Sequence, residues 1–341
     1  MNYRLIILLI IILTSVFHDG RSQDIHFSQF FNAPHNLNPS LTGFSNARMR
    51  FYINHRNQWA TVTVPFKTYA ATIDAQLLKR KQKGDMFGIG VSAFSDKAGD
   101  SNFGTQSVSF SMNYVRALGD YSTRNLIGFG LQVSYTGKSI DYYSLYFDDQ
   151  YDGVKFNPGS SSSEIFAIDN YQYYDVSAGV NWFTNINYDI TLQTGLSAWH
   201  LNRPYQSLMN DKTVRLPIKA IWHIESEISF SKPYRLLPAI LIQRQGTYTE
   251  IIFGSRFKFI SSEKPSTYSA FLFGLFYRNF DAVIVYSGYQ YKEWQFGISY
   301  DFNISTLRKA SRYLGGFELN LNWQMPTVRH PKPKDLPCPI F

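Results

Sequence analysis

Apolar and polar residues alternate along most of this chain, and the pattern is clearest in residues 105–115. Val108, Phe110, Met112 and Tyr114 occupy every second position, with serines and one asparagine between them. Because successive side chains of a β-strand point to opposite faces, this segment has one apolar and one small polar face. Segments of about ten residues with the same alternation recur downstream, as in outer-membrane barrels. The pattern therefore predicts an all-β fold, a transmembrane antiparallel β-barrel.

The same periodicity predicts about fourteen strands. They are expected at residues 47–56, 68–77, 86–94, 105–115, 125–136, 173–183, 188–198, 215–225, 237–244, 248–259, 267–278, 280–289, 292–303 and 316–324. An even number of strands places both ends of a bacterial barrel on the periplasmic side. The longest irregular segment, residues 137–171, is then expected to be an extracellular loop.

Charged residues indicate which face of each strand lines the lumen. In the first strand Arg48, Arg50 and Arg56 share one face with Tyr52 and Asn54. Three arginines on one face cannot point to lipid, so this face is predicted to be luminal. The opposite face is predicted to be lipid-facing and comprises Ala47, Met49, Phe51 and Ile53. Inward charged groups that could line a pore or neutralise each other in a plug are Arg48, Arg50, Asp74, Arg256, Arg278, Glu293 and Glu318.

The 341 residues divide into four predicted regions. Residues 1–22 have the features of a secretory signal peptide, with Arg4 ahead of an apolar run that is short for a membrane helix. An uncleaved anchor is the alternative. Residues 23–46, the lead-in, contain prolines and a glycine that oppose a regular element. Residues 47–324 form the barrel, and the proline-rich tail 325–341 is expected to be periplasmic, like the lead-in.

Composition supports a membrane barrel and excludes several other classes. Aromatic residues make up 17% of the chain and charged residues only 17%, which is low for a soluble surface. The net charge of +8 could serve an acidic partner, but luminal, loop and turn charges account for it and no nucleic-acid module is visible. The single cysteine, Cys338, excludes a disulfide framework and a multi-cysteine metal site.

No segment predicts a catalytic, cofactor or metal site, so we do not expect an enzyme. Gly88–Gly90 and Gly128–Gly130 lack the third glycine of a dinucleotide loop, and inward glycines more simply relieve crowding. The acidic run Asp148–Gly153 departs from a calcium loop because Gln150 replaces a carboxylate ligand. A membrane-embedded hydrolase would need a serine beside His55, His200 or His223, which the sequence cannot place.

The opening of the mature chain carries a family resemblance. The residues concerned are Gln23, Asp24, Phe27, Ser28 and Gln29, then Asn38, Pro39 and Gly43, then Arg56, Asn57, Gln58 and Trp59. This order resembles the opening of PorP/SprF-type outer-membrane proteins of the type IX secretion system in gliding and related bacteria. Weaker resemblances follow at Asp96–Gly99, Leu145–Gln150, Ser299–Asp301, Gly316–Leu319 and Cys338–Phe341, the last with Ile340 where a basic residue is frequent.

The resemblance implies a role in protein secretion, gliding motility or surface attachment. The implied partners are outer-membrane lipid, periplasmic and outer-membrane components of type IX secretion, and a secreted adhesin-like cargo. Sequence alone does not separate a core translocon role from a cargo-specific one. A porin-like or transport barrel remains the alternative.

The lead-in and first strand hold the candidate partner-binding residues. They are Gln23, Asp24, Phe27, Ser28, Gln29, Phe30, Phe31, Asn32, Asn38, Pro39, Gly43, Arg56, Gln58 and Trp59. Aromatic rings beside amide side chains are what a docking surface needs, because a few buried rings supply most of an interface's energy. The alternative is that the same rings plug the periplasmic mouth of the barrel.

Overall fold

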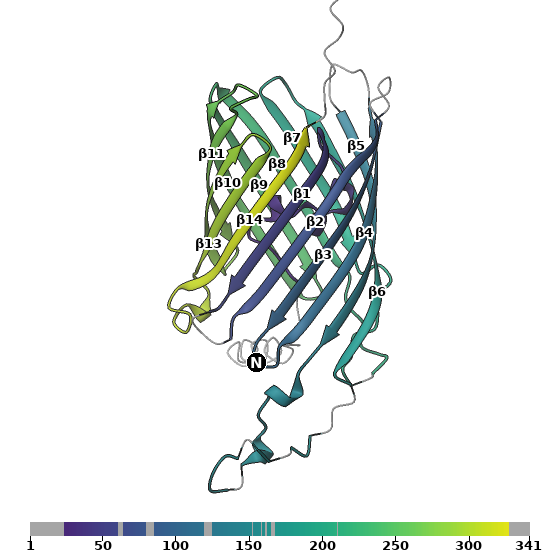
Figure 1. Ribbon diagram of the computed structural model, residues 1–341, viewed down its shortest axis with the longest axis vertical. Coiled ribbons are helices and arrows are strands. Elements are labelled where there is room, and N and C mark those ends of the chain that lie inside the picture. Colours follow the sequence, from purple (N-terminus) through teal and green to yellow (C-terminus); the bar gives the residue numbers. More distant parts are fainter. Residues whose placement is uncertain are drawn as a thin grey trace, which may run out of the picture.

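The strands close into one antiparallel barrel (Figure 1) in this computed structural model. The structure describes residues 24–60, 64–79, 85–118, 125–151, 153–157, 159–160, 162–164, 168–209 and 211–326. Each strand pairs with its neighbours in sequence, and β1 pairs with β14 to close the barrel. The predicted signal peptide, Gln23, Cys338 and residues 327–341 of the tail lie outside the described residues.

The barrel has fourteen strands, as the sequence predicts. They are β1 (Ala47–Gln58), β2 (Phe66–Lys79), β3 (Met86–Ala98), β4 (Phe103–Ala117), β5 (Asn125–Ser139), β6 (Asn170–Asn185), β7 (Ile190–Trp199), β8 (Lys219–Ser231), β9 (Tyr234–Gln245), β10 (Tyr248–Ser262), β11 (Ser269–Arg278), β12 (Ala282–Tyr291), β13 (Trp294–Asn303) and β14 (Leu314–Pro326). The short helices are η1 (Phe30–Asn32), α2 (Pro34–Leu37), η2 (Pro39–Leu41), η3 (Tyr142–Ser144), η4 (Asp148–Gln150) and η5 (Thr306–Arg308). None of the helices in the described ranges is long and apolar enough to span a membrane.

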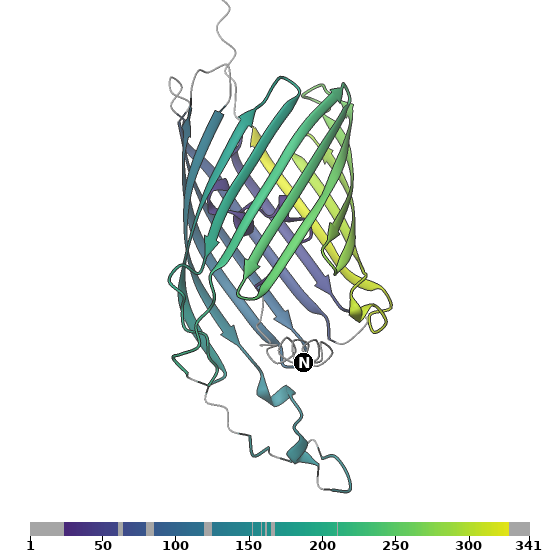
Figure 2. The same cartoon turned by 180° about the vertical axis from the view of Figure 1, so that it is seen from behind.

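The two ends of the barrel differ in the length of their connections. One end, here the long-loop end, carries residues 140–169 between β5 and β6 and residues 200–218 between β7 and β8 (Figures 1 and 2). At the other end, here the short-turn end, β8 and β9 are joined by residues 232–233. Ala47 and Pro326 pair at the short-turn end, so the first and last strand ends lie together as predicted.

The predicted faces are confirmed along β4 and β5. Phe110 and Val133 are exposed on the outer surface, whereas Ser109 and Ser134 are buried on the inside. Phe110 is the cross-strand partner of Val133, so apolar side chains adjoin across the outer surface. Such a surface suits lipid tails, and the polar inner face lines the lumen.

Three predicted positions are wrong. Arg48 is exposed and Ala47 is buried, because the β1–β14 register shifts between Ala47 and Met49 and reverses the alternation there. Glu293 is not a luminal strand residue: it lies in the turn between β12 and β13. The other inward charged groups are buried as predicted: Arg50, Asp74, Arg256, Arg278 and Glu318.

Candidate functional site

The lead-in runs inside the barrel, where it is drawn in purple among the strands (Figures 1 and 2). At its start, Asp24 contacts His200 and Gln245 at the long-loop end. Near its finish, the N–H of Gly43 donates to Asp74 Oδ2 at 2.9 Å, well along the lumen toward the short-turn end. The described lead-in therefore lies within the lumen, as in the plug alternative, and its predicted periplasmic location stays a prediction. Asp24 lies near the opposite end from Pro326.

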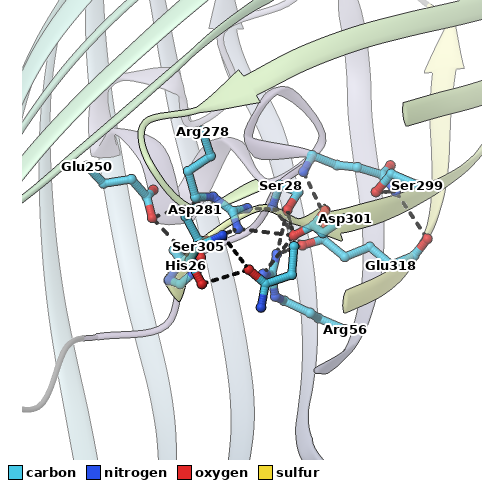
Figure 3. Close-up of polar contacts among 12 residues, drawn as sticks. His26, Ser28, Arg56, Glu250, Arg278, Asp281, Ser299, Asp301, Ser305 and Glu318 are labelled. Atoms are coloured by element: carbon cyan, nitrogen blue, oxygen red, sulfur yellow. Dashed lines mark hydrogen bonds and ion pairs between the residues drawn. The ribbon is translucent and has the colours of Figure 1, made fainter. Parts of the chain in front are cut away.

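A cluster of buried charges anchors the first part of the lead-in (Figure 3). The N–H of Ser28 donates to Glu318 Oε1 at 2.6 Å, and its hydroxyl donates to Asp301 Oδ2 at 2.7 Å. Arg56 forms ion pairs with both of these carboxylates, at 3.1 Å to Asp301. Arg278 also reaches Asp301 at 3.1 Å. The cluster joins the lead-in to β1, β11, β13 and β14 at one point.

His26 adds an uncharged group to the edge of this cluster. Its Nε2 lies 3.7 Å from Glu250 Oε2. Burial, together with the charges of Arg56 and Arg278, holds the pKa of His26 well below its ordinary value. The imidazole is therefore neutral near pH 7 and adds no further positive charge beside the two arginines.

A second anchor lies at Asp74 on β2, toward the far end of the lead-in. Arg50 Nε donates to Asp74 Oδ1 at 2.9 Å, and His35 Nε2 lies 3.0 Å from Asp74 Oδ2. Arg50 Nη2 also donates to the carbonyl of Leu41 at 2.7 Å. The buried Asp74 carboxylate on β2 thus binds His35 and the Gly43 N–H of the lead-in, and it also binds Arg50 of β1.

Asn38 and Pro39 form a sharp turn that lies against β5, β6 and β7. Asn38 Oδ1 accepts from the Ser40 N–H at 2.9 Å, which caps η2. Asn38 Nδ2 donates to the backbone carbonyls of β6 and β7, at 3.1 and 3.2 Å. On β5, a Cβ at Gly130 would collide with the backbone of Pro39 and Ser40. An inward glycine is what lets the turn reach the strand wall.

Aromatic rings of the lead-in fill the lumen on the side of β8–β12. Phe30 and Phe31 pack on Phe276, with ring centroids 6.1 and 5.5 Å away. The Arg256 guanidinium lies 3.7 Å from the centre of the Phe31 ring. Phe27 packs in a separate buried cluster. The rings are interior packing residues in this structure, as in the plug alternative, and not exposed anchors.

The remaining candidates divide into two groups. Gln29 and Asn32 join the luminal network, where Gln29 Nε2 donates to Ser299 at 3.0 Å and the two side chains hydrogen-bond each other. Gln58 and Trp59 lie at the end of β1 beside a cavity, apart from the lead-in anchors, and Trp59 stacks on Phe66. Binding of a partner by these residues stays a prediction.

Sequence reasoning missed the contact that fixes the start of the lead-in. His200 Nε2 lies 2.6 Å from Asp24 Oδ2, and His200 Nδ1 lies 3.0 Å from Asp175 Oδ2. Gln245 Nε2 donates to the same Asp24 oxygen at 3.2 Å. No local pattern marks this group, because Asp24 and His200 are 176 positions apart.

The Asp24–His200 contact shifts both titrations. Burial alone would lower the pKa of His200, but hydrogen bonds and charges from Asp175 and Asp24 outweigh it and raise the pKa to about 9. Burial alone would raise the pKa of Asp24, yet His200 holds it below its usual range. The pair is therefore ionised around neutral pH.

A cavity of about 810 Å³ lies between the lead-in and the barrel wall, on the long-loop side. Its lining combines hydroxyl and amide side chains with aromatic rings. The charged and histidine side chains on it are Asp24, His26, His35, Asp96, Lys138, Asp175, His200, Lys219 and Asp281. Lys138 continues the inward alternation of β5, which is the signal that could have predicted its position. In the described ranges, no group of three or more His, Cys, Asp or Glu could hold a metal ion.

Comparison with known proteins gives a family and a fold. The family of the type IX secretion system membrane protein PorP/SprF matches residues 20–323. Among solved structures, the toluene transporter TbuX of Ralstonia pickettii is 9% identical in sequence to this chain, with a TM-score of 0.50. The match covers 87% of this chain and 94% of TbuX. The monoaromatic hydrocarbon channel CymD is 8% identical with a TM-score of 0.50, covering 88% and 94%. The search of curated proteins found no match. The solved structures support an outer-membrane barrel fold and carry no functional argument at this identity.

Proposed function

This chain belongs to the PorP/SprF family of type IX secretion system membrane proteins, and we propose that it serves that system as a plugged barrel scaffold. In this role the barrel assists export or surface attachment of a secreted, adhesin-like cargo. It works with periplasmic and outer-membrane components of the system, and in gliding cells it contributes to motility. The role is non-enzymatic.

One observation carries the scaffold proposal: the lead-in lies in the lumen and is bonded to the barrel wall on several sides. Its residues bond to β1, β2, β13 and β14 through buried charged side chains and to β6 and β7 through Asn38. Removing one partner of a buried charge cluster costs several kcal/mol, about 3–5 in measured cases. These contacts favour a lead-in that stays in the lumen over one that moves out of the way when a solute passes.

The orientation proposed for the barrel follows from its loops. Outer-membrane barrels have longer loops outside the cell and short turns in the periplasm. The long-loop end is then extracellular and offers residues 140–169 and 200–218 to cargo. The short-turn end, with Ala47 and Pro326, is periplasmic. In this orientation Asp24 lies toward the extracellular end of the lumen, and the lead-in docks onto its own barrel.

A passive transport role is the second candidate, and the cavity of about 810 Å³ favours it. A transport barrel needs a path that continues past Thr42 and Gly43, where the lead-in meets β3 and β4. There Asn113 Nδ2 donates to the Thr42 carbonyl at 3.1 Å, and a Cβ at Gly88 would lie 2.9 Å from the Gly43 Cα. These contacts oppose a continuous path along this wall.

Single-channel conductance in a planar bilayer tests the choice. We expect the purified wild-type barrel to be silent and the Phe30→Ala/Phe31→Ala variant to conduct or to lose its heat-resistant gel mobility. Phe230→Ala, which removes an exposed ring on β8, is the matched control and should change neither readout. A steady open pore in the wild type would refute the plugged scaffold. Cargo export from cells that carry each variant then tests the secretion role.

A further inference from the structure

The charged groups around the cavity are not evenly paired. Asp24 and Asp175 share His200, and Asp281 lies 3.0 Å from Arg278. Asp96 accepts a hydrogen bond from Thr68 at 2.6 Å. Each carboxylate on the cavity wall therefore has a hydrogen-bond partner, although that of Asp96 is a neutral hydroxyl and the charge near Asp96 is that of Lys138.

The two lysines on the same wall, Lys138 and Lys219, lack such partners within the described ranges. Neither Lys138 nor Lys219 has a hydrogen-bond or ion-pair partner among the described residues, although the Lys138 ammonium lies 6.0 Å from the centre of the Phe103 ring. Lys138 is 6% exposed and Lys219 is 7% exposed. The carboxylates of Asp24 and Asp96 lie near enough to act on Lys138 through their charge, but neither forms a hydrogen bond with it. A buried ammonium that lacks hydrogen bonds is costly, so an anion that supplies them stabilises it.

Both lysines belong to one region of the cavity. Lys138 is the second-last residue of β5 and Lys219 is the first residue of β8, so both lie at the long-loop end. Each is close enough to Asp24 to contribute to the lowering of its pKa. Ser109 and Ser134 on the same wall add neutral hydroxyls that can donate to an anion, whereas the Thr136 hydroxyl is already bonded to Ser107 at 2.9 Å.

We propose that the cavity is an anion-binding site in which Lys138 and Lys219 together hold a carboxylate or phosphate group. Ammonium groups bind both as point charges, and the hydroxyl side chains complete the hydrogen bonds to their oxygens. The anion comes either from a small solute or from an acidic side chain or chain end of a polypeptide. The site does not depend on whether the barrel serves secretion or transport.

Binding to the purified full-length barrel in a neutral detergent tests the proposal. The probes are inorganic phosphate, acetate and a short peptide rich in aspartate, each followed by titration calorimetry at pH 7. Lys138→Gln and Lys219→Gln are each expected to weaken binding by about tenfold or more, the effect of one charge-assisted hydrogen bond. Lys258→Gln is the matched control, because Lys258 donates to Gln290 at 3.0 Å and does not line the cavity.

The outcomes separate the sources of the anion. Tighter binding of the peptide than of acetate, lost in both lysine variants, assigns the site to a polypeptide. Equal binding of peptide and acetate, or binding of phosphate only, assigns it to a small solute. Lys138→Arg and Lys219→Arg keep the charge and should bind within a few-fold of wild type, which guards against a folding defect. No binding of any probe, or equal loss in the Lys258→Gln control, overturns the proposal.

Discussion

Individual buried charges in the lumen are expected to dominate the stability of the plug. Arg56 contacts Asp301 and Glu318 and is 1% exposed. Arg56→Gln removes the cation and leaves the carboxylates crowded in a place where water cannot solvate them. We expect a loss of about 3–5 kcal/mol in unfolding free energy, measured by urea titration of the heat-resistant gel form.

Arg235 supplies the matched control for that change. It pairs with Glu227, but these side chains are 37% and 33% exposed. Because an exposed ion pair contributes about 0–1 kcal/mol, Arg235→Gln should shift the urea midpoint only slightly. If the two variants lose equal stability, the luminal cluster is not an anchor.

The Asp24–His200 contact predicts that the stability of the protein depends on pH. The pKa of His200 is raised from 6.5 to about 9, so its contribution to stability is fully present below pH 6.5 and is lost as the pH rises through 9. The pKa of Asp24 is lowered, so its contribution is present above 3.8 and is lost in stronger acid. The stability gap between wild type and His200→Gln should therefore be widest near pH 6 and shrink toward pH 10. Urea titrations at pH 6, 8 and 10 measure it, and a gap that grows with pH would contradict the assignment.

The strand is the element on which the sequence is most informative, and its faces can be tested directly. Phe110→Arg or Val133→Arg would put a guanidinium in lipid and should impair insertion by about 2–4 kcal/mol near the bilayer midplane. Ser109 and Ser134 line the cavity, so Ser109→Arg and Ser134→Arg should be tolerated much better. Folding yield into lipid vesicles is the measurement. Equal yields for the two pairs would overturn the face assignment.

Strands could be predicted from sequence because their signal is local: the period-two pattern that turns Phe110 outward is contained in a few neighbouring residues. The pattern fails at Arg48, where a register shift against β14 reverses the alternation, and that shift depends on a strand far away in sequence. The path of the lead-in could not be predicted, for the same reason. Ser28 meets Glu318 across 290 positions, and nothing near Ser28 encodes that partner.

Part of the site could still be anticipated at the level of elements. Charged residues at inward positions implied a plug or a pore. Arg50 pairs with Asp74 and Arg278 pairs with Asp301, in the two clusters that hold the lead-in. The inward Gly130 implied relief of crowding, and the lead-in backbone is what crowds it. Which segment fills the lumen depends on the closed barrel, so it becomes visible only in the structure.

For the whole molecule, the proposed orientation in the membrane can be tested by labelling the two ends. Tyr143, in the β5–β6 connection, and Tyr188, in the β6–β7 turn, are fully exposed at opposite ends, with relative exposures of 101% and 107%. In a Cys338→Ser background, Tyr143→Cys should react with a membrane-impermeant maleimide on intact cells. Tyr188→Cys should react only after the outer membrane is permeabilised, because short turns of outer-membrane barrels face the periplasm. The reverse pattern would invert the barrel and place the lead-in's start, with the lysine-lined cavity, on the periplasmic side.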